Sequence, residues 1–63
     1  MKVEFLAKVL REREVKTKEY LYRVVESENY LAIERKQLWQ FDVPRYAHLW
    51  ELVIVLMDRR EHK

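Results

Sequence analysis

The chain has 63 residues and a formal net charge of +2; 49% of its residues are apolar, 13% aromatic and 38% charged. This length predicts a single domain over residues 1–63, with a core so small that we expect a homodimer to complete it. The sequence contains no cysteine, which excludes disulfides and thiolate metal sites.

The amino-terminal stretch MKVEFLAKVL lacks the pattern of a secretory signal. The longest apolar run is LVIVLM at residues 52–57, far shorter than the roughly 20 residues that a membrane-spanning helix needs. We therefore expect a soluble, cytoplasmic protein without a membrane partner. The charge-rich, glycine-free composition is thermophile-like.

Residues 1–41 carry the pattern of an antiparallel meander. The stretch KVEFLAKVL alternates apolar and polar residues, which predicts a first strand. The runs EYLYRVVE and YLAIE are rich in β-branched and aromatic residues, and the tetrad ESEN between them predicts a hairpin turn. A second turn near Glu12–Glu14 completes three strands. The first stretch also fits a helix, through Phe5, Leu6, Val9 and Leu10.

The carboxyl-terminal third predicts a helix. Pro44 suits a first helical turn, and Arg59 and Arg60 suit the negative end of a helix dipole. Between them apolar residues recur at helical spacing: Tyr46, Leu49, Trp50, Val53, Ile54 and Met57. The predicted fold class is thus α+β, a three-stranded antiparallel meander over about 1–41 followed by a C-terminal α-helix over about 44–60. The alternative is an all-α helical hairpin, in which Thr17 caps the second helix.

Catalytic and metal chemistry have little support in the sequence. Ser27 lies in a predicted turn, and the only histidines are His48 and His62, so no nucleophile–base pair is apparent. His48 and Glu51 stand three residues apart on the predicted helix, a spacing that ligates a metal only if a dimer doubles it. We expect no enzyme activity, no cofactor and no metal.

Cations and tyrosines are interleaved in the predicted hairpin. If residues 15–25 form one strand, Lys16, Lys18, Tyr20 and Tyr22 share a face. Such a ribbon fits a DNA major groove, or its tyrosines stack on unpaired bases. A register shifted by one residue instead packs the tyrosines beneath the helix. The candidate nucleic-acid-binding residues are Lys16, Lys18, Tyr20, Tyr22, Arg23, Arg35 and Lys36.

The predicted helix over residues 44–60 is apolar around most of its circumference, which indicates burial on more than one side. It is the candidate dimer or partner interface, through Leu49, Trp50, Val53, Ile54 and Met57. Trp39, Phe41 and Trp50 are interpreted as core or interface residues.

The segment LREREVKTKEYLYRVVESENYLAIERKQLWQFDVPRYAHLWELV runs from a basic strand through a tyrosine-rich strand and a third strand to a helix. In this order it resembles the small three-stranded-sheet-plus-helix DNA-binding domains, such as the arm-binding domain of tyrosine integrases. The resemblance implies that the sheet enters the major groove and that the seven candidate residues contact DNA. The chain departs from the family in lacking turn glycines and in carrying Glu34 on that face.

Two functions follow from the sequence. The first is a small nucleic-acid-binding protein, regulatory or accessory in role, whose partner is DNA or RNA. The second is a non-catalytic protein-interaction or dimerisation module that acts through the apolar C-terminal segment.

Overall fold

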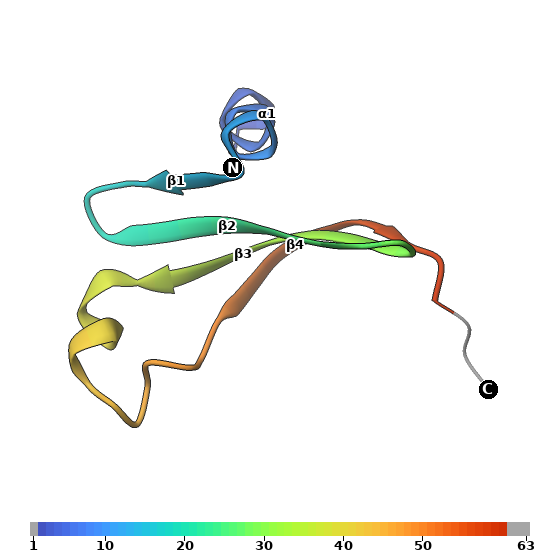
Figure 1. Ribbon diagram of the computed structural model, residues 1–63. Coiled ribbons are helices and arrows are strands. Elements are labelled where there is room, and N and C mark those ends of the chain that lie inside the picture. The colour runs from blue at the N-terminus through green and yellow to red at the C-terminus, as the bar shows by residue number, and fades with distance from the viewer. Residues whose placement is uncertain (1, 61–63) are drawn as a thin grey trace.

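A computed structural model of the chain describes residues 2–60. Its elements are α1 (Val3–Glu12), β1 (Glu14–Lys16), β2 (Tyr20–Ser27), β3 (Tyr30–Gln37), the 3-10 helix η1 (Leu38–Asp42) and β4 (Glu51–Asp58). The strands form one antiparallel sheet in the order β1-β2-β3-β4, with α1 beside β1 (Figure 1). Within residues 2–60, no helix has the length and apolar character needed to cross a membrane.

The helix is at the opposite end of the chain from the one predicted. α1 occupies the stretch that was assigned to the first strand, and Arg13 ends it in the left-handed conformation with φ of 72°. Its apolar residues lie on one stripe: Val9 is fully buried, and Phe5, Leu6 and Leu10 pack around it. The strand prediction is wrong here because a period of two would place Leu6 and Leu10 in solvent, whereas helical spacing gathers all four residues on one face.

The predicted hairpin is confirmed. β2 and β3 pair from Tyr20 opposite Gln37 to Ser27 opposite Tyr30, so Glu28 and Asn29 form the turn inside the ESEN tetrad. β1 is much shorter and joins β2 through residues 17–19.

The core lies between α1 and one face of the sheet. Val9, Val15, Tyr22 and Ile33 are buried there. The ring of Phe5 on α1 meets the ring of Tyr22 edge-on, with centroids 4.8 Å apart. The register of the hairpin is therefore the alternative one, in which the tyrosines pack beneath a helix.

The C-terminal segment is a strand, so the helix predicted over residues 44–60 is wrong, and so is the all-α alternative. Residues 44–48 form a turn, and β4 pairs with β3. Residues 35, 33 and 31 of β3 pair with residues 51, 54 and 57 of β4, because two irregularities leave residues 53 and 56 of β4 without an opposite partner. These bulges convert a period of two into a period of three, which imitates helical spacing. The β-branched run Val53–Val55 then favours the strand.

Candidate nucleic-acid interface

The tyrosines of the predicted binding surface face α1. Tyr22 is buried, and its hydroxyl accepts a hydrogen bond from Arg35 Nη1 at 3.5 Å. The guanidinium carbon of Arg35 lies 4.3 Å from the centroid of the Tyr20 ring, and its Nη2 donates to Glu51 at 2.8 Å. The hydrogen bond to Glu51, helped by that to Tyr22, raises the pKa of Arg35 above its ordinary value. Tyr22 thus offers no free ring face, and one face of Tyr20 is occupied by Arg35.

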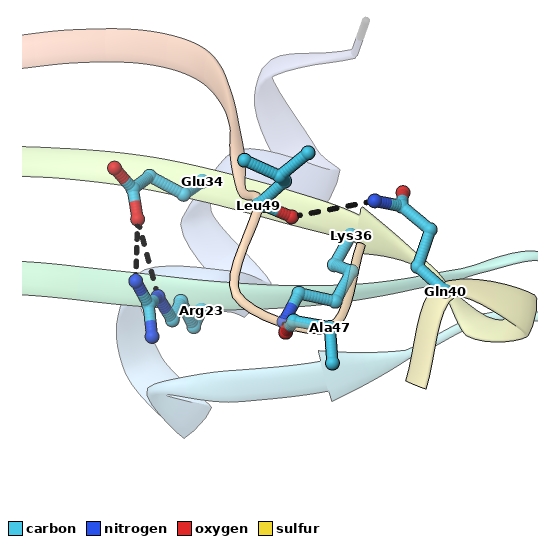
Figure 2. A network of polar contacts seen from close by, with 6 residues as sticks. All are labelled: Arg23, Glu34, Lys36, Gln40, Ala47 and Leu49. Carbon is cyan, nitrogen blue, oxygen red and sulfur yellow. Dashed lines mark hydrogen bonds and ion pairs between the residues drawn. The ribbon is translucent and has the colours of Figure 1, made fainter. Parts of the chain in front are cut away.

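Arg23 projects from the opposite face of the sheet. Its Nε and Nη2 donate to one carboxylate oxygen of Glu34, at 3.2 and 2.8 Å (Figure 2). Its guanidinium carbon lies 3.7 Å from the centroid of the Trp50 ring. Arg23 is therefore committed to contacts within the chain.

Lys36, on the same face as Arg23, is a buried lysine with only 3% of its surface exposed. Its ammonium donates to the carbonyl oxygen of Ala47 (Figure 2). It also lies 4.6 Å from the ring centroid of Phe41 and 4.5 Å from that of Trp50. A buried cation requires such partners. Lys36 therefore holds the segment that follows β3 in place, and its burial prevents contact with a phosphate.

That segment, residues 38–50, is here called the aromatic loop. Gln40 Nε2 donates to the carbonyl oxygen of Leu49 at 3.5 Å (Figure 2). It also donates to the carbonyl oxygen of Tyr46 at 3.3 Å, and the two contacts fold the loop back on itself. The backbone N–H of Leu38 donates to the carbonyl oxygen of Glu19 at 2.9 Å. The loop is thereby held against the turn between β1 and β2.

The loop presents large aromatic side chains to solvent. Trp39 is 53% exposed, Phe41 45% and Tyr46 37%. The rings of Trp39 and Tyr46 meet edge-on with centroids 5.6 Å apart. Trp39 and Phe41 are therefore not part of the core of this chain, whereas Trp50 is half-buried beside Arg23.

A cavity of about 300 Å³ opens where the aromatic loop meets the β1–β2 turn, and we call it the Trp39 pocket. It is lined by Lys18, Glu19, Gln37, Leu38 and Trp39. The indole N–H of Trp39 donates to the amide oxygen of Gln37, whose Nε2 donates to the Tyr20 hydroxyl at 3.4 Å. The pocket thus combines a planar aromatic wall with an ammonium, an amide and a carboxylate.

Further cations surround this end of the sheet. Lys16, Lys18 and Arg45 are exposed, and within residues 2–60 none of the three forms an ion pair. The guanidinium carbon of Arg45 lies 5.7 Å from the Tyr46 ring centroid. Of the seven predicted residues, only Lys16 and Lys18 therefore remain exposed and outside the ion-pair and stacking contacts.

Trp39 was missed as a site residue, although the predicted hairpin contained the signal. Tyr20 pairs with Gln37. Because antiparallel partners keep a constant sum of residue numbers, the same register places Lys18 opposite Trp39. The proximity of Lys18 and Trp39 could therefore have been predicted from the register of the hairpin.

The metal interpretation loses its geometric basis. His48 lies in the turn and Glu51 begins β4, so they do not share a helix face, and Glu51 binds Arg35. In the described part of the chain, no group of three or more histidine or carboxylate side chains is placed to hold a metal ion.

The order of elements also differs from that of the resembled DNA-binding domains, because α1 precedes the sheet instead of following it. No protein-family model matches this chain, and neither a curated protein nor a solved structure matches it.

Proposed function

We propose that this protein binds single-stranded nucleic acid at the Trp39 pocket, without catalysis, in a regulatory or accessory role in the cytoplasm. The observation that carries the proposal is an exposed indole beside the exposed ammonium of Lys18, in a cavity that also holds amide and carboxylate groups. Stacking of a base on an aromatic side chain contributes about 1–3 kcal/mol, so the indole raises the affinity supplied by phosphate contacts by a factor of about 5 to 150.

Each lining group has a matching partner in a nucleotide. The Trp39 ring stacks on a base. The second amide N–H of Gln37, whose first donates to Tyr20, and the carboxylate of Glu19 face the hydrogen-bonding groups on the base edge. Lys18 neutralises the adjoining phosphate, and Lys16 and Arg45 contact phosphates farther along the strand. Glu19 repels a phosphate that enters the pocket itself, which directs the base inward and the backbone outward.

The surface favours an unpaired strand over a duplex. Stacking needs a base whose ring face is free, as in single strands. Three aromatic side chains of the aromatic loop, Trp39, Phe41 and Tyr46, are exposed. The ribbon that was expected to enter a major groove has its tyrosine face covered by α1.

Fluorescence anisotropy with labelled single-stranded DNA, single-stranded RNA and duplex DNA tests the function at about 50 mM and about 200 mM salt. We expect binding that prefers single strands and weakens with salt. Trp39→Ala should reduce affinity by about tenfold or more, corresponding to one lost stack. Val3→Ala, which truncates a 79% exposed side chain on α1, is the control and should leave binding unchanged.

Two results count against the proposal in different ways. Absence of binding to every probe at the lower salt concentration would contradict nucleic-acid binding itself. Binding that Trp39→Ala leaves unchanged would contradict the pocket and direct attention to another surface. The interaction function considered from the sequence was assigned to Leu49, Trp50, Val53, Ile54 and Met57. Leu49 and Trp50 lie in the aromatic loop, and the other three lie on β4, where Val53 and Ile54 pack against the core.

A further inference from the structure

β4 is a long edge strand whose sequence holds neither lysine nor proline. Of the features that protect edge strands, it has the two bulges at residues 53 and 56 and charged residues at its two ends. It ends the strand order, and its eight residues include the run LVIVLM at 52–57. Natural edges of this length carry lysine, proline or a covering segment that blocks pairing with another chain. The opposite edge strand, β1, has three residues and contacts α1. The two edges therefore differ in their capacity to accept a further strand.

The outward surface of β4 is apolar. Leu52 is 51% exposed, Val55 40% and Leu56 41%. Leu52 and Val55 lie opposite Glu34 and Ala32 of β3, on the face that α1 does not cover. Contiguous apolar side chains at an open edge indicate an association surface.

The exposed area of the chain fits one missing partner. Its solvent-accessible surface is 5102 Å², whereas a compact monomer of 7.9 kDa exposes about 4,400 Å². The difference, roughly 700 Å², is close to the roughly 800 Å² that each partner buries in a standard interface. The radius of gyration is 12.8 Å, against about 10.6 Å for a compact domain of this length. Both values exceed those of a compact domain, because the molecule is flat, with extents of 36 × 31 × 17 Å, and β4 forms an open edge.

The charges at the two ends of β4 complement each other. Glu51 begins the strand and pairs with Arg35 of its own chain. Asp58 ends the strand, and Arg59 and Arg60 follow it, with Arg60 paired to Asp58. This end therefore keeps a net charge of 2 − 1 = +1, opposite in sign to that of Glu51. In an antiparallel pair of two identical strands, the acidic start of one lies beside the basic end of the other. A parallel pair would place like charges together. The strand is thus self-complementary in the antiparallel sense.

We propose that β4 pairs antiparallel with β4 of a second copy of this chain, across a two-fold axis near Val55. The two four-stranded sheets then become one continuous sheet, and Leu52, Val55 and Leu56 of both copies cover each other. The pairing is isologous and occupies the long free edge of each copy, so assembly closes at a dimer. The Trp39 pocket has no part in this contact, and the proposal is independent of nucleic-acid binding.

Sedimentation velocity of the intact chain, from about 1 to about 200 μM, tests the proposal, since most specific interfaces associate within or below this range. We expect a dimer. Val55→Lys should weaken the dimer by about 100-fold, because two ammonium groups would meet at the axis. The matched control Val3→Lys places the same charge on an exposed residue of α1 and should leave the dimer intact.

A second variant keeps the test valid if Val55→Lys fails to fold. The chain has no cysteine of its own, so Val55→Cys introduces a single thiol. With oxidised glutathione as the electron acceptor, two such thiols near the axis should join as a disulfide-linked dimer, whereas Val3→Cys should remain largely unlinked. Two results would contradict pairing with a second copy at this edge. One is a wild-type chain that stays monomeric at about 200 μM, and the other is equal cross-linking of Val55→Cys and Val3→Cys. A strand from a different protein would then be the alternative occupant.

Discussion

The guanidinium carbon of Arg23 lies 3.7 Å from the centroid of the Trp50 ring, while the same group donates two hydrogen bonds to Glu34. This contact joins β2 to the residue before β4, across the intervening β3. A cation on an indole face contributes about 0.5–2 kcal/mol, depending on how far it is desolvated. The planar guanidinium stacks and hydrogen-bonds at the same time, which the ammonium of lysine does poorly.

Replacing Arg23 by lysine therefore tests the geometry of the contact at constant charge. We expect Arg23→Lys to lower the free energy of unfolding by about 1 kcal/mol, measured by urea denaturation. Arg13→Lys is the matched control, because the Arg13–Glu26 pair is more exposed on both sides and should lose less than about 0.5 kcal/mol. Equal losses in the two variants would show that the Trp50 stack contributes nothing.

Removing the buried ammonium of Lys36 should loosen the aromatic loop. Lys36→Ala leaves the Ala47 carbonyl without this donor and removes the cation from Phe41 and Trp50. We expect a loss of about 1–3 kcal/mol in the free energy of unfolding. Hydrogen exchange of the loop amides should accelerate more than that of β2. Lys36→Met restores most of the volume without the charge, so its free energy of unfolding should lie between those of the wild type and Lys36→Ala. If Lys36→Ala is as stable as the wild type, Lys36 does not anchor the loop.

Arg13 offers a site for stabilisation. Its φ of 72° places an L-residue in a region that costs about 1–2 kcal/mol, and the sequence contains no glycine to relieve it. Because glycine also has a more flexible unfolded state, we expect Arg13→Gly to gain about 0.5–1 kcal/mol relative to Arg13→Ala. Both variants lose the ion pair with Glu26, so thermal unfolding of the two isolates the backbone effect. A less stable glycine variant would contradict strain at this position.

The lysines of the β1–β2 turn should determine how binding depends on salt. Each phosphate contact to a single strand contributes about 0.7 to the slope of log affinity against log salt. The double variant Lys16→Ala/Lys18→Ala should therefore flatten the slope by about 1.4. Lys2→Ala/Lys8→Ala removes the same charge from exposed positions at and beside α1 and is the control. Identical slopes for the two double variants would mean that long-range charge alone attracts the nucleic acid.

The hairpin was predictable because its determinants are local. The β-branched and aromatic residues of β2 and β3 and the polar turn between them lie within one short stretch. The turn also fixes the pairing of every residue from Tyr20 to Gln37. Which face lies beneath a helix is not local information, because it depends on where α1 docks.

β4 could not be predicted from its own periodicity. Its bulges at residues 53 and 56 are defined by pairing with β3, and no residue in the run LVIVLM announces them. The burial of Lys36 is likewise a property of the aromatic loop that folds over it. The candidate site was predicted in part. Lys16 and Lys18 were expected to bind nucleic acid, whereas Trp39 was assigned to the core or an interface.

The agreement between strand order and chain order has a consequence for how the chain folds. Each strand pairs with its neighbour in sequence, so folding requires only short loop closures, which favour rapid folding. The two-residue turn between β2 and β3 is the smallest closure, whereas β4 joins through the much longer aromatic loop. We therefore expect the hairpin to form first and β4 to be added last. The strand that joins last is also the one that carries the open edge.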